Sequence, residues 1–136
     1  MKKAIILLII FASLFISAAF AETSIKAEVD KTIVTTDNSI TYKLIITSLE
    51  KNIPIPQLPK FTGFKIISSA QSSSVTFTKG NVKTAIVYVF VLAPGGIGKF
   101  KIEPSTIKIR NESFSTADFE IEVNPVRNTK PLNKEN

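Results

Sequence analysis

Apolar and polar side chains alternate along most of the chain after its first twenty residues, and this period of two constrains the fold more than any other feature. The alternation is seen in 25–30 and 40–46, and it returns in 99–103, 107–110 and 118–123. Successive side chains of a β-strand point to opposite faces, so this pattern is typical of half-buried strands. Since no later segment has the apolar spacing of an amphipathic helix, we expect an all-β protein.

Turn-forming residues divide these stretches at short intervals. TDNS (36–39), TKGN (78–81) and RNES (110–113) are typical of turns, and three prolines within 51–59 indicate an extended connection. The stretch 84–93 is apolar on both faces, so we expect a central strand covered on both sides. About seven to eight strands of this kind predict an immunoglobulin-like antiparallel β-sandwich.

The N-terminus resembles an export signal. Two lysines precede an almost wholly apolar stretch (4–16), and Ala-Phe-Ala at 19–21 is a small-x-small cleavage pattern. We expect a signal peptide over 1–21 and cleavage after Ala21; the alternative is an uncleaved membrane anchor. The β-sandwich domain then covers 22–123, and 124–136 is a polar tail that we expect to be disordered.

Composition excludes several classes of function. The chain has no histidine and no cysteine, which excludes ordinary zinc sites, Ser-His and Cys-His catalysis, and disulfides. Its 17 basic and 11 acidic side chains are scattered, without the concentrated basic face that nucleic-acid binding needs. We therefore expect no cofactor, no metal, no nucleic acid and no small-molecule substrate.

Two motifs with a catalytic appearance fail on inspection. Gly98-Lys99 ends a glycine-rich stretch, but a phosphate-binding loop needs a Ser or Thr next and then a helix, whereas Phe100 and an alternating strand follow. We expect a turn in which Gly95, Gly96 and Gly98 can take positive φ. Ser105 and Lys108 match Ser-x-x-Lys, yet on a strand these positions point to opposite sides. A hydrolase using them is our least favoured hypothesis.

The remaining polar positions give one weak candidate for a site. Asp30, Asp37 and Glu50 are too dispersed to indicate a calcium site, and the glycosylation sequon at Asn111 is best interpreted as a chance match. The serine-rich residues 68–74 indicate an exposed edge strand or a flexible connection. If an edge is used for binding, the stretch 68–78 is the candidate, because it is strand-prone and little charged. Its candidate partner-contact residues are Ser72, Ser73, Ser74, Thr76 and Thr78.

In this order of strands and turns the chain resembles the first domain of the BatD (oxygen tolerance) family. The similar segments are VDKTIVTTDNSITYKLII (29–46), LPKFTGFKIISSAQSSS (58–74), VYVFVLAPGGIGKFKIEPSTIKI (87–109) and FSTADFEIEV (114–123). The chain departs from the family at Asp37-Asn38, where a glycine is usual, and at Lys60, where an acidic residue is common. Full-length members also carry further β domains and a C-terminal membrane helix, and no apolar run of spanning length follows the signal here.

The resemblance implies a bacterial envelope protein without enzymatic activity, encoded near von Willebrand A-domain proteins and MoxR-type ATPases. Our leading hypothesis is an exported, periplasmic or envelope-associated protein-binding module, whose partner is an envelope protein such as a von Willebrand A-domain membrane protein. It contacts a membrane itself only if the signal stays uncleaved. The alternative is a carbohydrate or cell-wall binding β-sandwich, which the absence of tryptophan disfavours.

Overall fold

A computed structural model describes residues 23–127, which form nine strands and no helix. The predicted signal peptide and residues 128–136 of the predicted tail lie outside the described residues. The strands are β1 (Thr23–Val29), β2 (Ile33–Thr35), β3 (Ile40–Ser48), β4 (Phe64–Thr78), β5 (Asn81–Pro94), β6 (Gly98–Ile102), β7 (Thr106–Ile109), β8 (Glu112–Ser115) and β9 (Phe119–Asn124).

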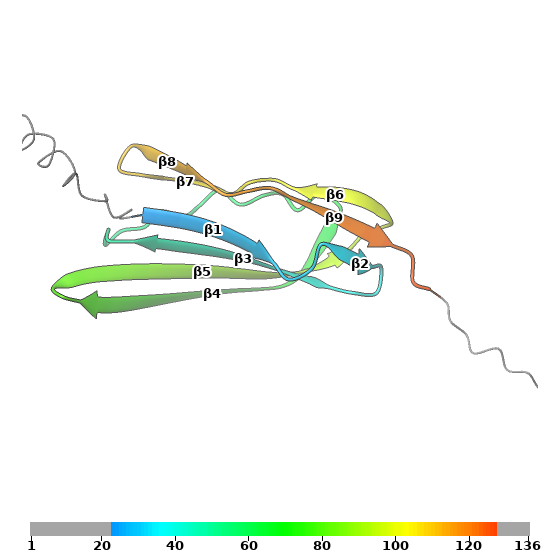
Figure 1. The fold of residues 1–136 in the computed structure, drawn as a ribbon, viewed down its shortest axis with the longest axis horizontal. Coiled ribbons are helices and arrows are strands. Elements are labelled where there is room, and N and C mark those ends of the chain that lie inside the picture. Colours follow the sequence, from blue (N-terminus) through cyan, green and yellow to red (C-terminus); the bar gives the residue numbers. More distant parts are fainter. Residues whose placement is uncertain (1–22, 128–136) are drawn as a thin grey trace, which may run out of the picture.

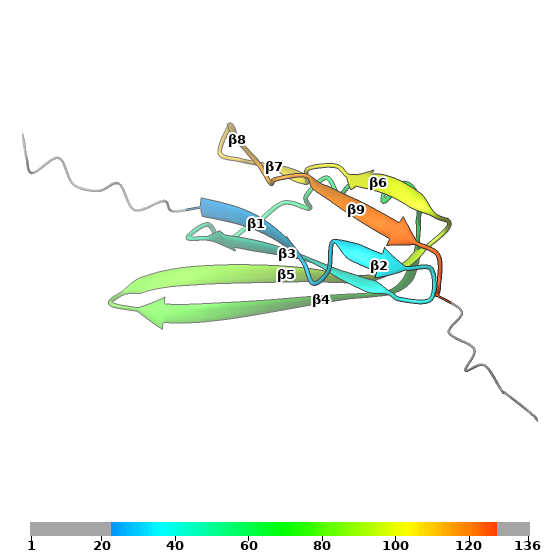
Figure 2. The same ribbon diagram turned by 45° about the vertical axis from the view of Figure 1, so that its right-hand side comes forward.

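The strands form two layers, as Figures 1 and 2 show. One layer is a four-stranded antiparallel sheet in the order β1-β3-β5-β4. The other contains the sheet β2-β9-β6 and the hairpin β7-β8. The predicted all-β sandwich is confirmed, with one departure from the antiparallel pattern, because β2 pairs with β9 in parallel.

The core lies between the layers and is centred on β3. Ile40, Tyr42, Leu44 and Ile46 alternate along this strand and all four are completely buried. Inward-facing residues of β7 and β9 pack opposite them, among them Ile107 and Ile121. The sequence pattern thus places one face of β3, β7 and β9 in a shared apolar interior, where each large side chain contributes about 1.5–3 kcal/mol.

A buried polar network crosses this core. The Tyr42 hydroxyl lies 2.6 Å from Ser105 Oγ, and the Ser105 backbone N–H donates to Thr116 Oγ1 at 2.9 Å. Burial raises the pKa of Tyr42 above its usual value, although the hydrogen bond with Ser105 opposes that shift. The network therefore ties the four-stranded sheet to the segment between β6 and β7.

Two tight turns close the hairpins that the sequence predicted. Lys79 and Gly80 join β4 to β5 with φ of 49° and 79°. Arg110 and Asn111 join β7 to β8 with φ of 51° and 61°. Positive φ at both central residues is the signature of a type I′ turn, whose twist matches that of the flanking strands.

The glycine-rich segment is also a turn, but its predicted conformations were only partly right. Gly98 has a φ of 140°, whereas Gly95 and Gly96 do not adopt positive φ. Gly95 has a different role, because its N–H donates to the carbonyl oxygen of Gly63 at 2.8 Å. A Cβ at Gly95 would lie 3.2 Å from that oxygen, so close backbone approach is what this position requires.

Strand β5 is central in its sheet, as expected, but the expectation that both its faces are covered was wrong. Phe90 and Leu92 face the second layer and are buried, whereas Val87, Val89 and Val91 lie on the opposite face and are only half-buried. At the other end of the chain, β9 extends to Asn124, one residue into the predicted tail.

We predict that Tyr42→Phe lowers the free energy of unfolding by about 1–3 kcal/mol, because it leaves the buried Ser105 hydroxyl without its partner. Urea unfolding at neutral pH measures this change.

The difference between the two proteins also depends on pH. Since burial raises the folded pKa of Tyr42 above its usual 10.0, its stabilising contribution is complete below that pH and is lost as the pH rises through the folded pKa. Stability differences measured from neutral pH to above pH 10.0 should therefore shrink with increasing pH. A difference that stays constant would contradict this assignment.

A second prediction concerns glycine. A Cβ at Gly63, where φ is 90°, would lie 2.2 Å from Phe100 Cδ1, so Gly63→Ala should destabilise by more than the ~1 kcal/mol of backbone strain alone. Gly80 is the matched control, since its φ is 79° but no atom lies within 4 Å of an added Cβ. Thermal unfolding should show a much larger loss for Gly63→Ala than for Gly80→Ala; equal losses would contradict it.

Candidate functional site: the free edge of β4

The serine-rich stretch forms most of β4, which lies at an edge of the four-stranded sheet (Figure 1). It pairs with β5 on one side and with no described strand on the other. Every described side chain from Lys65 to Phe77 is exposed, and no charged residue occurs between Lys65 and Lys79. A long, uncharged edge of this kind is a template for another strand, because its outer backbone groups are unpaired.

The tight turn fixes which backbone groups are free. Thr78 and Asn81 flank the two-residue turn and form a hydrogen-bonded pair, since the i to i+3 bond of the turn joins them. Hydrogen-bonded and non-hydrogen-bonded pairs alternate along an antiparallel ladder, and this register is unbroken from Thr78 back to Ser68. Alternate residues therefore direct their N–H and C=O groups away from β5. These residues are Ser69, Gln71, Ser73, Val75 and Phe77.

The five residues predicted from the sequence all lie on β4, but they differ in what they present. Ser73 directs its backbone to the free edge. The backbones of Ser72, Ser74, Thr76 and Thr78 face β5 instead, opposite Val87, Ala85, Lys83 and Asn81. The side chains of Ser72, Ser74 and Thr76 are exposed. The alternating set was not predicted from the sequence, although counting back from the turn at 79–80 would have found it.

The edge is interrupted at only one place. The register shifts between Ile66 and Ser68, which is a β-bulge near the start of the strand. Bulges, charges and prolines are the usual protection of an edge strand, and beyond this bulge β4 has none of them. The stretch 68–78 is thus continuous and available for pairing.

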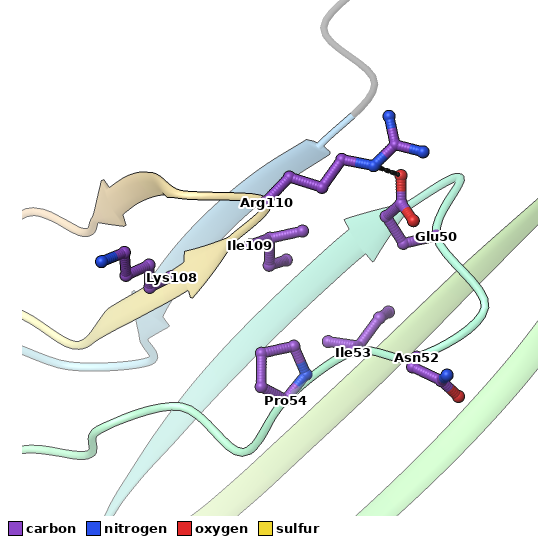
Figure 3. Close-up of a pocket in the computed structure, with 7 residues that line it drawn as sticks. All are labelled: Glu50, Asn52, Ile53, Pro54, Lys108, Ile109 and Arg110. Atoms are coloured by element: carbon purple, nitrogen blue, oxygen red, sulfur yellow. Dashed lines mark ion pairs between the residues drawn. The ribbon is translucent and has the colours of Figure 1, made fainter.

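A shallow groove of about 360 Å³ lies elsewhere, beside the β7-β8 turn (Figure 3). Ile53, Pro54 and Ile109 supply its apolar surface, while Arg110 Nε pairs with Glu50 Oε1 at 2.5 Å. Figure 3 shows Lys108 pointing away from that ion pair. Since its Arg and Glu pair with each other, the groove presents a small apolar surface beside this ion pair.

Neither of the two rejected motifs has the structure that its chemistry would need. Ser105 is completely buried against Tyr42, whereas Lys108 is exposed, so the two do not form a dyad. Gly98-Lys99 begins strand β6 rather than a helix, and Lys99 Nζ lies 3.8 Å from Glu120 Oε1.

The dispersed carboxylates are used locally. Asp30 Oδ1 accepts from the Thr41 N–H at 2.7 Å, Asp37 accepts from the Thr35 hydroxyl, and Glu50 pairs with Arg110. Within residues 23–127 no group of three potential metal ligands gathers. The two tyrosines offer no exposed ring for stacking on a sugar, because Tyr42 is buried and Tyr88 is half-buried.

Comparison with known proteins identifies the domain. The family model described as the BatD DUF11-like domain matches residues 27–123, from the middle of β1 almost to the end of β9. No curated protein and no solved structure matches the chain. In the part of the chain that the structure describes, no helix is long and apolar enough to cross a membrane.

Adjacent residues of β4 direct their N–H groups to opposite sides, so proline should have very different effects on stability at neighbouring positions. Ser73→Pro removes an N–H that faces the free edge, so the free energy of unfolding should change by less than ~1 kcal/mol. Ser72→Pro removes an N–H that faces β5 and should cost about 3 kcal/mol. Urea unfolding of both variants tests this assignment. A larger loss of stability for Ser73→Pro would mean that the Ser73 N–H faces β5 and the Ser72 N–H faces the free edge.

Proposed function

This chain belongs to the BatD family, and we propose that it is an exported, non-catalytic protein-binding module of the bacterial cell envelope. BatD family proteins are associated with the envelope and with aerotolerance. Protein binding, export and the lack of catalysis are our proposals. They are supported by the free strand edge, by the export-like sequence of residues 1–21 and by the burial of Ser105 away from Lys108.

The observation that carries the proposal is the unpaired outer edge of β4. A partner strand can add to such an edge through main-chain hydrogen bonds, while its alternate side chains give specificity. The outward backbone groups from Ser69 to Phe77 provide a ladder for it. From Ser68 to Ser74 the side chains are mostly serines, and strand side chains point above and below the sheet, so a partner backbone can approach the edge.

The two faces of β4 would offer a partner strand different surroundings. On the face towards the second layer lie Gln71, Ser73 and Val75, which pair with Tyr88, Ile86 and Thr84 of β5. On the opposite face serines lie beside Val87 and Ala85. A partner strand with short side chains towards one face and apolar side chains towards the other would fit this edge.

The expected partner is the periplasmic part of a von Willebrand A-domain membrane protein, as the family resemblance implies. Because the stretch between Lys65 and Lys79 carries no charge, pairing along it should depend little on salt. Weakening by salt would instead assign part of the affinity to the basic surface of the module.

The test is calorimetry of the chain lacking residues 1–21 with that domain at two salt concentrations. Binding in the micromolar range or tighter is expected for the unaltered protein. Ser73→Pro should weaken it at least tenfold, because the edge loses a donor and gains a ring that obstructs the ladder.

Ser73→Ala is the matched control, since it removes the hydroxyl but keeps the N–H, and its affinity should equal that of the unaltered protein. If the protein gives no binding heat, the expected partner is wrong. If Ser73→Pro binds as well as Ser73→Ala, pairing along β4 is wrong.

A further inference from the structure

The end of the β4-β5 hairpin combines exposed apolar side chains with lysines. We call Val75, Phe77, Lys79, Val82 and Lys83 the hairpin tip. Phe77 is 77% exposed, Val75 54% and Val82 37%. Large apolar side chains with this exposure occur together here rather than singly, which is typical of an interaction surface.

The strand register gives the hairpin tip two different faces. Phe77 lies directly opposite Val82, so both point to the same side of the hairpin, and Val75 follows two residues away on that side. Lys83 lies opposite Thr76 and points to the other side. With Lys79 in the turn itself, the tip is apolar on one face and basic on the other face and at its end.

The hairpin extends beyond the rest of its sheet. Strand β3 ends at Ser48, opposite Thr84, so residues 81–83 of β5 have no neighbour on that side. Figures 1 and 2 both show the end of the hairpin reaching past β1 and β3. The second layer therefore does not cover the apolar face of the tip.

The charge along the hairpin and the chain on either side of it has one sign. No aspartate or glutamate occurs from residue 51 to residue 102, a stretch that contains seven lysines. Lys99 and Lys101 from this stretch pair with carboxylates of β9 and its preceding loop. No ion pair within residues 23–127 involves Lys79 or Lys83, so both ammonium groups are available to an external anion.

We propose that the hairpin tip binds the surface of an anionic phospholipid bilayer. Val75, Phe77 and Val82 would reach the boundary between headgroups and acyl chains, where apolar side chains leave water. Lys79 and Lys83 would lie at the headgroup phosphates, which ammonium groups attract without a fixed geometry. The charged side chains of the tip are lysines alone, which suits a surface of many phosphates.

The absence of tryptophan from the chain permits a local test. The full-length Phe77→Trp variant carries a single tryptophan at the tip. With vesicles of phosphatidylglycerol and phosphatidylcholine, its emission should shift to shorter wavelength and be quenched by brominated lipid. Ile97→Trp is the matched control, because Ile97 is 62% exposed in the turn at the opposite end of β5. Its emission should not change, even though both variants carry the same residues 1–21.

Charge is tested in the Phe77→Trp background. Lys79→Gln with Lys83→Gln should raise the lipid concentration at half-maximal shift about 25-fold, or about fivefold for each lysine. Lys60→Gln with Lys65→Gln removes the same charge near the start of β4 and should change it less than twofold.

The outcomes separate this proposal from the proposed function. No shift of Phe77→Trp, or the same shift in Ile97→Trp, would overturn it, and so would an equal shift on phosphatidylcholine alone. Ser73→Pro combined with Phe77→Trp keeps the apolar face and both lysines of the tip, so it should retain the lipid response while losing the protein partner. If this variant loses both responses, lipid binding depends on the free backbone edge at Ser73 and not on the side chains of the tip, which contradicts the proposal.

Discussion

The burial of one face of β3 is the constraint on which the rest of the structure depends. Its four inward side chains are completely buried, and one of them, Tyr42, carries a hydroxyl that must have a partner in the interior. Ser105 supplies that partner from the short segment between β6 and β7. The second layer is therefore fixed at the point where the chain passes from the sheet β2-β9-β6 to the β7-β8 hairpin. The apolar residues of β7 and β9 take their positions around that point.

The second layer is smaller than the sheet that it covers. Because it packs over β3, β1 and the inner part of β5, little of it reaches β4, whose described side chains from Lys65 to Phe77 are all exposed. Phe64 at its start packs against the core and Phe100, but from Lys65 onward the strand is held by its ladder to β5. A sheet edge that contributes little to the core can change its sequence at little cost in stability, so the composition of β4 is free to serve binding.

The turn-forming residues predicted the hairpin turns, and the uncharged serine-rich stretch indicated β4 as an edge strand. The alternation of apolar residues predicted the fold class. It could not give the parallel pairing of β2 with β9, because a three-residue strand carries too little pattern to show its partner. It also suggested that both faces of β5 are covered. The valines of the outer face are only half-buried, because they pack beside their neighbours within the sheet and are not buried by a second layer. For the candidate site, the strand was predictable, but its free backbone groups follow from the register at Thr78 and Asn81.

The pairing of β2 with β9 also bears on the order in which the fold forms. The β4-β5 and β7-β8 hairpins join residues that are close in sequence and can form early. Ile33, in contrast, pairs with Glu122, so this ladder must close a loop that contains most of the domain. A growing chain can assemble its hairpins, but it cannot complete the layer that covers β3 until its last strand is present. Folding of this domain is therefore completed when β2, near its start, pairs with β9 at its end, and this step requires the whole of 23–124.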